Sequence, residues 1–149
     1  MNIVLVEPEI PTNTGNIGRL CVGFNATLHL IGPLGFEITD SRVKRAGLDY
    51  WPDLSIHQYA SFEEWHQQIA DESRIFLFTT HTDKSYSQVD FQAGDWLVFG
   101  KESVGLSADI QNRFQEQLVT IPFPGKVRSF NLSNAVAIAL SEANRQFTL

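Results

Sequence analysis

The sequence contains only one cysteine, Cys21, among its 149 residues. One chain can therefore form neither an internal disulfide nor a zinc site made of several cysteines. Cys21 falls on the apolar face of a predicted helix, where a small buried side chain is far commoner than a nucleophile with a base beside it. We expect an unreactive thiol in a protein of a reducing compartment.

Long hydrophobic runs and a leader segment are also missing. The longest apolar runs have the length of β-strands, and the first residues lack the basic flank and cleavage site of a signal peptide. These observations predict a cytoplasmic protein with no membrane segment.

Positive charge is scarce, because 11 Lys and Arg stand against 17 Asp and Glu and the net charge is −6. Phosphate neutralisation dominates the affinity of proteins for nucleic acids, so a chain of this net charge is not expected to bind RNA across its whole surface. Any RNA contact must be local. Basic residues cluster at residues 42–45 and 125–128, and each cluster is either a solvated polar face or a phosphate-binding patch.

Two nucleotide-binding motifs are absent, the G-x-G-x-x-G of dinucleotide-binding enzymes and the phosphate loop G-x-x-x-x-G-K-[ST]. Their absence argues against dehydrogenases and nucleotide hydrolases. Among the four histidines no pair has metal-ligand spacing, so we predict no metal site. Only His81 lies near the loops considered below.

The residues that are present describe an ordinary globular protein, with 43% apolar residues, 19% charged residues and 11 Phe. Short apolar runs bounded by turn residues alternate with helix-period segments, which predicts an α/β fold with a mostly parallel sheet and covering helices. We expect strands near residues 2–6, 28–31, 55–59, 74–78, 96–99 and 118–121. No linker or repeat interrupts the pattern, so residues 1–149 are predicted to form a single domain.

The last segment has the clearest helical pattern, an apolar face made of Leu132, Ala135, Val136, Ala139, Leu140, Ala143 and Phe147. Its alanines predict a helix packed closely against it. An earlier helix is predicted from the stripe of Ile17, Leu20, Cys21 and Phe24. Ser61 and Ser107 are predicted to cap two further helices, the first in a capping box with Glu64.

In open parallel sheets, ligands bind beyond the carboxyl ends of the strands. Three loops leave such ends, at residues 79–81, 100–106 and 122–125. If their strands are neighbours, these loops converge on one pocket. We expect Gly100 to let the backbone approach a ligand and Gly105 to permit the turn back into a helix, although both can also be ordinary turn glycines.

Polar residues on two helices are further candidates for the site. Arg19 lies within the apolar stripe of the first predicted helix, and residues 129–134 place serines and asparagines at the start of the last one. The simpler interpretations are a solvated arginine head on an apolar stem, and helix capping.

Four segments carry a family resemblance: residues 7–21 (EPEIPTNTGNIGRLC), 99–106 (FGKESVGL), 121–122 followed by 128–136 (RSFNLSNAV), and 45–51 (RAGLDYW). Together they resemble the SpoU-TrmD (SPOUT) RNA methyltransferases over nearly the whole chain, and within them the TrmL/YibK group of tRNA wobble-nucleoside 2'-O-methyltransferases. The resemblance implies methyl transfer from S-adenosylmethionine to the ribose of a wobble cytidine or 5-carboxymethylaminomethyluridine. The alternatives are a 2'-O-methyltransferase of another RNA site, an S-adenosylmethionine-binding module without chemistry, and an RNA-binding assembly protein without a small ligand.

The resemblance also implies a C-terminal trefoil knot, in which the last helix is threaded through a loop. Physical reasoning alone would not predict it, because knots are nearly absent among folds. By the same resemblance, the cofactor would contact Phe78, Thr79, Gly100, Glu102, Ile121, Ser129 and Leu132.

The resemblance gives Arg19 the central chemical role, with Asn13 and Asn131 as its catalytic partners. Arg19 would help to remove the proton of the ribose 2'-hydroxyl. Because a guanidinium normally stays protonated, it acts as a base only in an unusual environment and otherwise stabilises the alkoxide by its charge. The expected RNA-binding residues are Arg19, Arg45, Lys126 and Arg128.

The partners implied are tRNA and a second copy of the chain. In the homodimer, Arg19 of one subunit would complete the pocket of the other. The alanine face of the last helix, Ala135, Ala139 and Ala143, suggests close helix packing between subunits.

Overall fold

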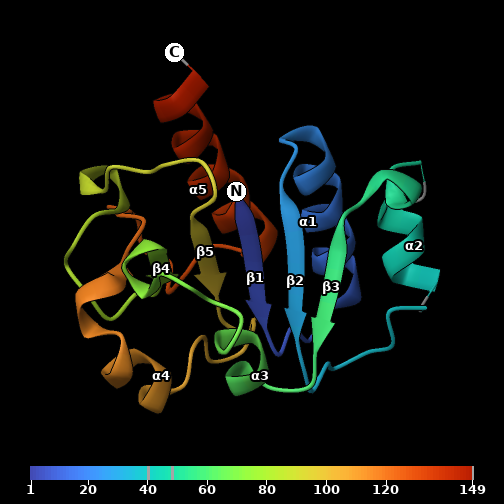
Figure 1. The fold of residues 1–149 in the computed structure, drawn as a ribbon, viewed down its shortest axis with the longest axis horizontal. Coiled ribbons are helices and arrows are strands. Elements are labelled where there is room, and N and C mark those ends of the chain that lie inside the picture. The colour runs from blue at the N-terminus through green and yellow to red at the C-terminus, as the bar shows by residue number, and fades with distance from the viewer. Residues whose placement is uncertain (40, 48, 149) are drawn as a thin grey trace.

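The computed structural model describes residues 1–39, 41–47 and 49–148. Within these residues the chain forms one six-stranded sheet in which every paired strand is parallel to its neighbour, in the order β3-β2-β1-β5-β4-β6 (Figure 1). The strands are β1 (Asn2–Val6), β2 (Thr27–Ile31), β3 (Ile56–Tyr59), β4 (Ile75–Phe78), β5 (Trp96–Phe99) and β6 (Leu118–Val119). The predicted α/β class with a mostly parallel sheet is confirmed.

The helices are α1 (Pro11–Gly23), α2 (Ser41–Gly47), α3 (Phe62–His66), α4 (Ala108–Arg113) and α5 (Leu132–Thr148). Single turns of 3-10 helix cover Trp51–Asp53, Glu72–Arg74, Tyr86–Gln88 and Gln115–Gln117. None of the helices in the described part of the chain is long and apolar enough to cross a membrane.

Successive residues of each strand face opposite sides of the sheet, so two cores form. Ile3 and Leu5 point into the larger core, which α1 and α5 cover. Val4 and Val6 point into the smaller one, which holds Trp65 and lies under α3 and α4. Figure 1 shows α1 and α5 together behind the sheet.

The alanine face of α5 packs inside its own chain. Ala139 and Ala143 are fully buried in the core that also contains Ile17 and Cys21 of α1. The predicted close-packed helix is therefore the chain's own α1, and the use of these alanines as evidence for a subunit contact is wrong. Burial of Cys21 raises its pKa to about 12, as expected of an inert thiol.

Helix α2 was not predicted, because its seven residues carry only a short apolar pattern. It packs closely on α1 at Gly15, where a Cβ would lie 2.5 Å from Ala46 Cβ and 2.6 Å from the Val43 carbonyl oxygen. Only glycine permits this approach of the two backbones.

Two predicted caps are present. The hydroxyl of Ser61 accepts a hydrogen bond from the Glu64 N–H at 3.2 Å, and that of Ser107 accepts one from the Ile110 N–H at 3.3 Å. The Glu64 carboxylate accepts from the N–H of Ala60, one residue before the cap, at 2.6 Å. Helix α3 ends at His66, so it is shorter than the apolar pattern suggested.

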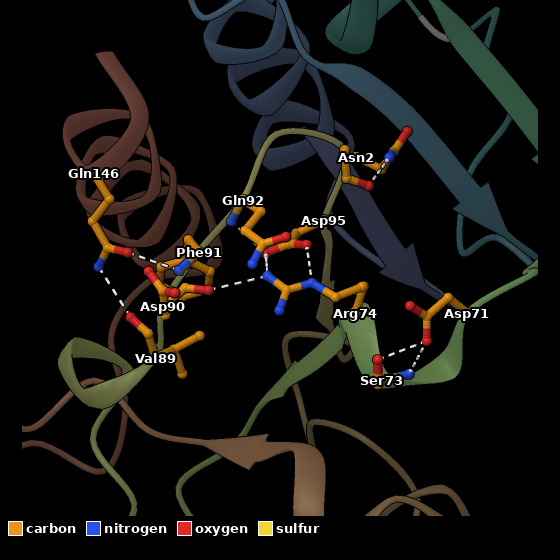
Figure 2. Close-up of polar contacts among 11 residues, drawn as sticks. Asn2, Asp71, Ser73, Arg74, Val89, Asp90, Phe91, Gln92, Asp95 and Gln146 are labelled. Carbon is orange, nitrogen blue, oxygen red and sulfur yellow. Dashed lines mark hydrogen bonds and ion pairs between the residues drawn. The ribbon is translucent and has the colours of Figure 1, made fainter. Parts of the chain in front are cut away.

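Polar groups at the amino ends of β4 and β5 form a closed set, the amino-end cluster of Arg74, Asp90, Gln92 and Asp95 (Figure 2). The Arg74 guanidinium donates to the Asp95 carboxylate through Nε at 2.7 Å and to the Asp90 carbonyl at 3.0 Å. The second Asp95 oxygen accepts from the Gln92 N–H at 2.8 Å. The Asp95 side chain is only 2% exposed, whereas that of Arg74 is 28% exposed, so the carboxylate is the buried partner of this pair.

Helix α5 is joined to the same edge of the sheet by Gln146 (Figure 2). Its amide accepts from the Phe91 N–H at 2.7 Å and donates to the Val89 carbonyl at 3.1 Å. The loop before β5 is thereby fixed to the C-terminal helix.

Candidate active site

A cavity of about 570 Å³ opens at the carboxyl ends of β4, β5 and β6. All three predicted loops contribute to its wall, through residues 78–81, residues 99–106, and Thr120, Ile121 and Phe123, together with the starts of α1 and α5. The expectation that these loops converge is confirmed. A cavity of this size suits a small-molecule ligand.

One wall of the cavity is apolar. The rings of Phe78 and Phe99 stack with their centroids 4.6 Å apart at the ends of neighbouring strands, and both are buried. Leu106, Ile121 and Leu132 extend this wall. Such a surface can cover a planar ring or a thioether chain of a ligand.

Position 100 is a glycine because the loop after β5 folds back there and brings two stretches of backbone close together. A Cβ would lie 2.1 Å from the carbonyl carbon of Gly105 and 2.2 Å from the N of Leu106. Close backbone packing is thus a reason for glycine here beside the expected approach of a ligand, and the residue does line the cavity. Gly105 has φ of +73°, so its predicted turn role is confirmed.

Gln111 of α4 is a site residue that the sequence analysis missed. Its buried amide donates to the Leu106 carbonyl at 2.8 Å and accepts from the Thr79 hydroxyl at 2.8 Å. The same oxygen lies 3.3 Å from Nδ1 of His81. The sequence signal for a buried Gln111 was its position directly after Ile110 and three residues before Phe114, because both of these apolar residues face the smaller core.

Glu102 connects the loop after β5 to the start of α1. Its carboxylate accepts from the N–H groups of Glu9 at 2.7 Å and Ile10 at 3.0 Å, and from the Asn13 side chain at 3.3 Å. Helix α1 has no side-chain cap from its own N-cap residue, Ile10; Glu102 instead binds the N–H of that residue and places a negative charge at the positive end of the helix.

Two further contacts hold residues 100–106 against the segment between β1 and α1. The Glu9 carboxylate accepts from the Ser103 N–H at 2.9 Å, and the hydrogen bonds from Ser103 lower the pKa of Glu9. Lys101 pairs with Glu7, which raises the pKa of Lys101. The loop is therefore fixed along much of its length.

Asn13 and Asn131 meet at the cavity. The Asn131 amide donates to Oδ1 of Asn13 at 3.1 Å, and Asn13 is buried. The other end of Asn131 accepts from the N–H groups of Ser133 at 3.0 Å and Asn134 at 3.4 Å. Asn131 thus caps α5, as the capping interpretation predicted, and also connects α5 to Asn13 and through it to Glu102.

Arg19 does not line this cavity. It is exposed on α1 and borders a shallower groove of about 480 Å³ between α1 and α5, beside Leu20 and Ser133. Six residues of α-helix separate it from Asn13, about 9 Å along the axis and about 240° around it. The two side chains therefore leave different sides of α1, and only Asn13 lines the cavity. The Arg19 guanidinium carbon instead lies 4.6 Å from the centroid of the Tyr50 ring.

The other predicted residues divide between the cavity and the surface. Ser129 and Arg128 line the cavity. Lys126 is exposed on the same loop, and Arg45 is exposed on α2. Among the residues whose placement is described, no group of three or more His, Cys, Asp or Glu could hold a metal ion.

Sequence comparison places the chain among known proteins. Residues 1–141 match the model of the SpoU rRNA Methylase family. The chain is 47% identical to the tRNA (cytidine(34)-2'-O)-methyltransferase of Burkholderia cenocepacia (strain HI2424), over 97% of this chain and 94% of that protein. It is 49% identical to the protein of the same name from Photorhabdus asymbiotica, over 98% of this chain and 93% of that one.

Solved structures share the fold. One, described as giving structural insights into the 2-OH methylation of C/U34 on tRNA, superposes with a TM-score of 0.94 at 42% identity and covers 99% of this chain and 95% of its own. The SpoU methyltransferase AviRb from Streptomyces viridochromogenes, in complex with AdoMet, superposes with a TM-score of 0.85 at 26% identity, over 98% of this chain and 57% of its own.

Proposed function

The chain belongs to the SpoU rRNA Methylase family, and we propose that it transfers a methyl group from S-adenosylmethionine to the 2'-hydroxyl of cytidine or uridine 34 of tRNA. The resemblance inferred from the sequence motifs is confirmed at the level of the family. One observation carries the proposal: three of the four segments that carry the resemblance meet at one cavity, in a chain whose near-full-length relatives are named for this reaction.

The cavity fits S-adenosylmethionine in size and in chemistry. Phe78, Ile121 and Leu132 offer an apolar wall for the adenine ring, whereas Thr79, Ser129 and the backbone beside Gly100 offer polar groups for the ribose and the amino acid part. Glu102 would contribute indirectly, because its carboxylate already accepts three hydrogen bonds, from Asn13 of α1 and from the two residues directly before that helix.

When bound, the cofactor supplies a methyl carbon on a sulfonium, which the ribose 2'-oxygen takes as the carbon–sulfur bond breaks. The residues of the chain must orient this oxygen and lower the cost of losing its proton, which passes to solvent water because a protonated guanidinium cannot accept it. Arg19 carries that role as a fixed positive charge beside the developing alkoxide. Asn13 and Asn131 position the segments around the cavity and do not position the reacting atoms themselves.

We infer that the active unit is a homodimer with shared sites. Arg19 faces away from the cavity of its own chain and borders the groove between α1 and α5, so a second copy seated on these helices would receive it. Family membership further implies the trefoil knot, with α5 threaded through the preceding loop, in a single domain that spans residues 1–149.

The RNA contacts proposed are local, as the net charge of −6 requires. Arg128 stands at the cavity and Lys126 on the same loop, while Arg19 and Arg45 extend the positive charge across α1 and α2. The proposed tRNA substrate supports the expected cytoplasmic location.

The first experiment measures methyl transfer from labelled S-adenosylmethionine to a tRNA pool, followed by mapping of the modified nucleoside. Arg19→Ala should lower turnover at least about hundredfold, as loss of one transition-state donor does, and leave cofactor affinity unchanged. The matched control is Arg113→Ala, which removes an exposed arginine paired with Glu63. Methylation mapped elsewhere would identify another RNA site, and cofactor binding without any transfer would identify a binding module.

The second experiment tests the shared site by mixing two inactive variants. Arg19→Ala keeps the cavity, and Ile121→Glu places a charge in its apolar wall. Randomly mixed dimers contain one intact site in half of the molecules, so about a quarter of parental activity should return. No recovery in mixed dimers verified by mass, or a monomer in sedimentation, would contradict the proposal.

A further inference from the structure

We propose that Tyr50 is a positioning residue that holds the guanidinium of Arg19 in the direction its role requires. The inference rests on the proposed methyl transfer. Arg19 is exposed on α1, and its guanidinium carbon lies 4.6 Å from the centroid of the Tyr50 ring, within the range of a cation–π contact. Tyr50 belongs to the 45–51 segment, in which only Arg45 has been given a role above; its Leu48 lies outside the described residues.

The Tyr50 ring is held firmly enough to act as a support. Tyr50 is half-buried and begins a turn of 3-10 helix, in which its carbonyl accepts from the Asp53 N–H at 3.0 Å. That turn rests on Gly18, where a Cβ would lie 3.1 Å from Leu54 Cδ2 and 3.6 Å from a ring carbon of Trp51. The segment is thus fixed to α1 at the residue directly before Arg19.

An arginine on an exposed helix face has several rotatable bonds, and most of its conformers point into water. A ring face beneath the guanidinium favours one set of conformers and leaves the donor groups at its edge free for RNA. The phenol hydroxyl takes no part in this contact. Replacement by phenylalanine should therefore preserve the effect, and replacement by leucine should abolish it.

The attraction alone corresponds to about a two- to fivefold change in rate, and misplacement of a reacting group by about 1 Å can cost about a hundredfold. We expect Tyr50→Leu to lower kcat by at least about fivefold, with unchanged affinity for S-adenosylmethionine by calorimetry. Tyr50→Phe should retain parental turnover. Tyr59→Leu is the matched control, because it removes a half-buried tyrosine of β3 in the same way.

A spectroscopic measurement gives a readout independent of activity. In protein labelled with nitrogen-15 arginine, the Arg19 Nε–H resonance, assigned through Arg19→Lys, should carry a ring-current shift. The shift should persist in Tyr50→Phe and Tyr59→Leu and vanish in Tyr50→Leu.

The outcomes separate this inference from the proposed function. Parental protein that transfers no methyl group to RNA would overturn the proposed function, whatever the spectra show. Active parental protein with equal turnover in Tyr50→Leu, or with a Tyr50→Phe variant as impaired as Tyr50→Leu, would overturn the role of Tyr50. An Arg19 resonance that is the same in the parent and in Tyr50→Leu would also overturn it.

Discussion

The amino ends and the carboxyl ends of the parallel strands form two edges of the sheet, and similar polar residues have opposite effects at the two. At the amino edge, Arg74 and Asp95 satisfy each other and the neighbouring backbone, and Gln146 joins α5 to the same region (Figure 2). At the carboxyl edge, Gln111 and Glu102 are equally engaged, yet they hold loops around an open cavity. The first edge closes the sheet, and the second keeps a space open.

The difference lies in where the hydrogen bonds lead. The amino-end cluster connects adjacent strand ends to one another, so its hydrogen-bonding groups are paired within the fold. The bonds of Glu102 and Gln111 instead fix the backbones of loops whose remaining polar groups face the cavity. Substitutions at the amino edge should therefore affect stability, and those at the carboxyl edge should affect ligand binding.

The largest expected effect is at the amino edge. Arg74→Met leaves the Asp95 carboxylate buried without its partner, and we expect the free energy of unfolding to fall by about 3 kcal/mol, at the low end for buried pairs because Arg74 is partly exposed. Urea unfolding measures it. Arg145→Met, which removes a 59% exposed arginine, should change stability by less than about 0.5 kcal/mol. Lower turnover per folded Arg74→Met molecule would break the comparison.

The next effect is at the carboxyl edge. Gly100→Ala forces a Cβ onto the backbone of Gly105 and Leu106, so the loop must move, and affinity for S-adenosylmethionine should fall on the order of hundredfold by calorimetry. Gly125→Ala is the control, because its Cβ would meet no atom within 4 Å. Parental affinity in Gly100→Ala would mean that the close backbone contact at Gly100 is not needed for the pocket.

A third prediction concerns His29, whose Nε2 contacts Asn2 at 3.2 Å while Nδ1 contacts the Tyr59 hydroxyl at 3.1 Å. Burial, with a smaller effect of His57, lowers its pKa to about 4. Between pH 6.5 and pH 4 the unfolded chain then binds more protons than the folded one, so stability falls as pH falls.

We expect this loss to be on the order of 2 kcal/mol. Urea unfolding at pH 7, 5.5 and 4 measures it. His29→Gln should flatten the dependence over this range, and an unchanged slope in that variant would assign the proton to another group.

The smallest effects come from a matched pair of amides. Gln146→Leu leaves the Val89 carbonyl and the Phe91 N–H unpaired and should cost about 1 kcal/mol of stability, with cofactor affinity unchanged. Gln111→Leu frees the Leu106 carbonyl and should also weaken cofactor binding severalfold. Equal binding in both variants would show that the two edges differ less than proposed.

Local pattern was enough to predict most of the fold. The first five strands lie within one residue of their expected bounds, because buried parallel strands are short apolar runs between turn residues. The last helix begins at Leu132, as its apolar stripe indicated. Strand order could not be predicted, since six parallel strands permit many crossovers, and β6 is shorter than its apolar run.

The site was predicted where it follows from strand ends and motifs. Thr79, Gly100 and Ile121 line one cavity because parallel strands end at the same edge. Gln111 and Tyr50 were missed, because their contacts join residues far apart in the sequence. The same limit applies to the alanines of α5, whose small side chains indicated a close neighbour without saying which helix it would be.

The bonds of Glu102 have a thermodynamic consequence. They join the loop at the cavity to Asn13 of α1 and to the residues directly before it, and α1 is the helix on which the second subunit is proposed to rest. Occupancy of the cavity and self-association then act on one shared element. By reciprocity, the factor by which pairing of two chains tightens cofactor binding equals the factor by which cofactor tightens the pairing. A shift in the dimerisation constant on addition of ligand would therefore report, from outside the pocket, on how firmly Glu102 couples the two.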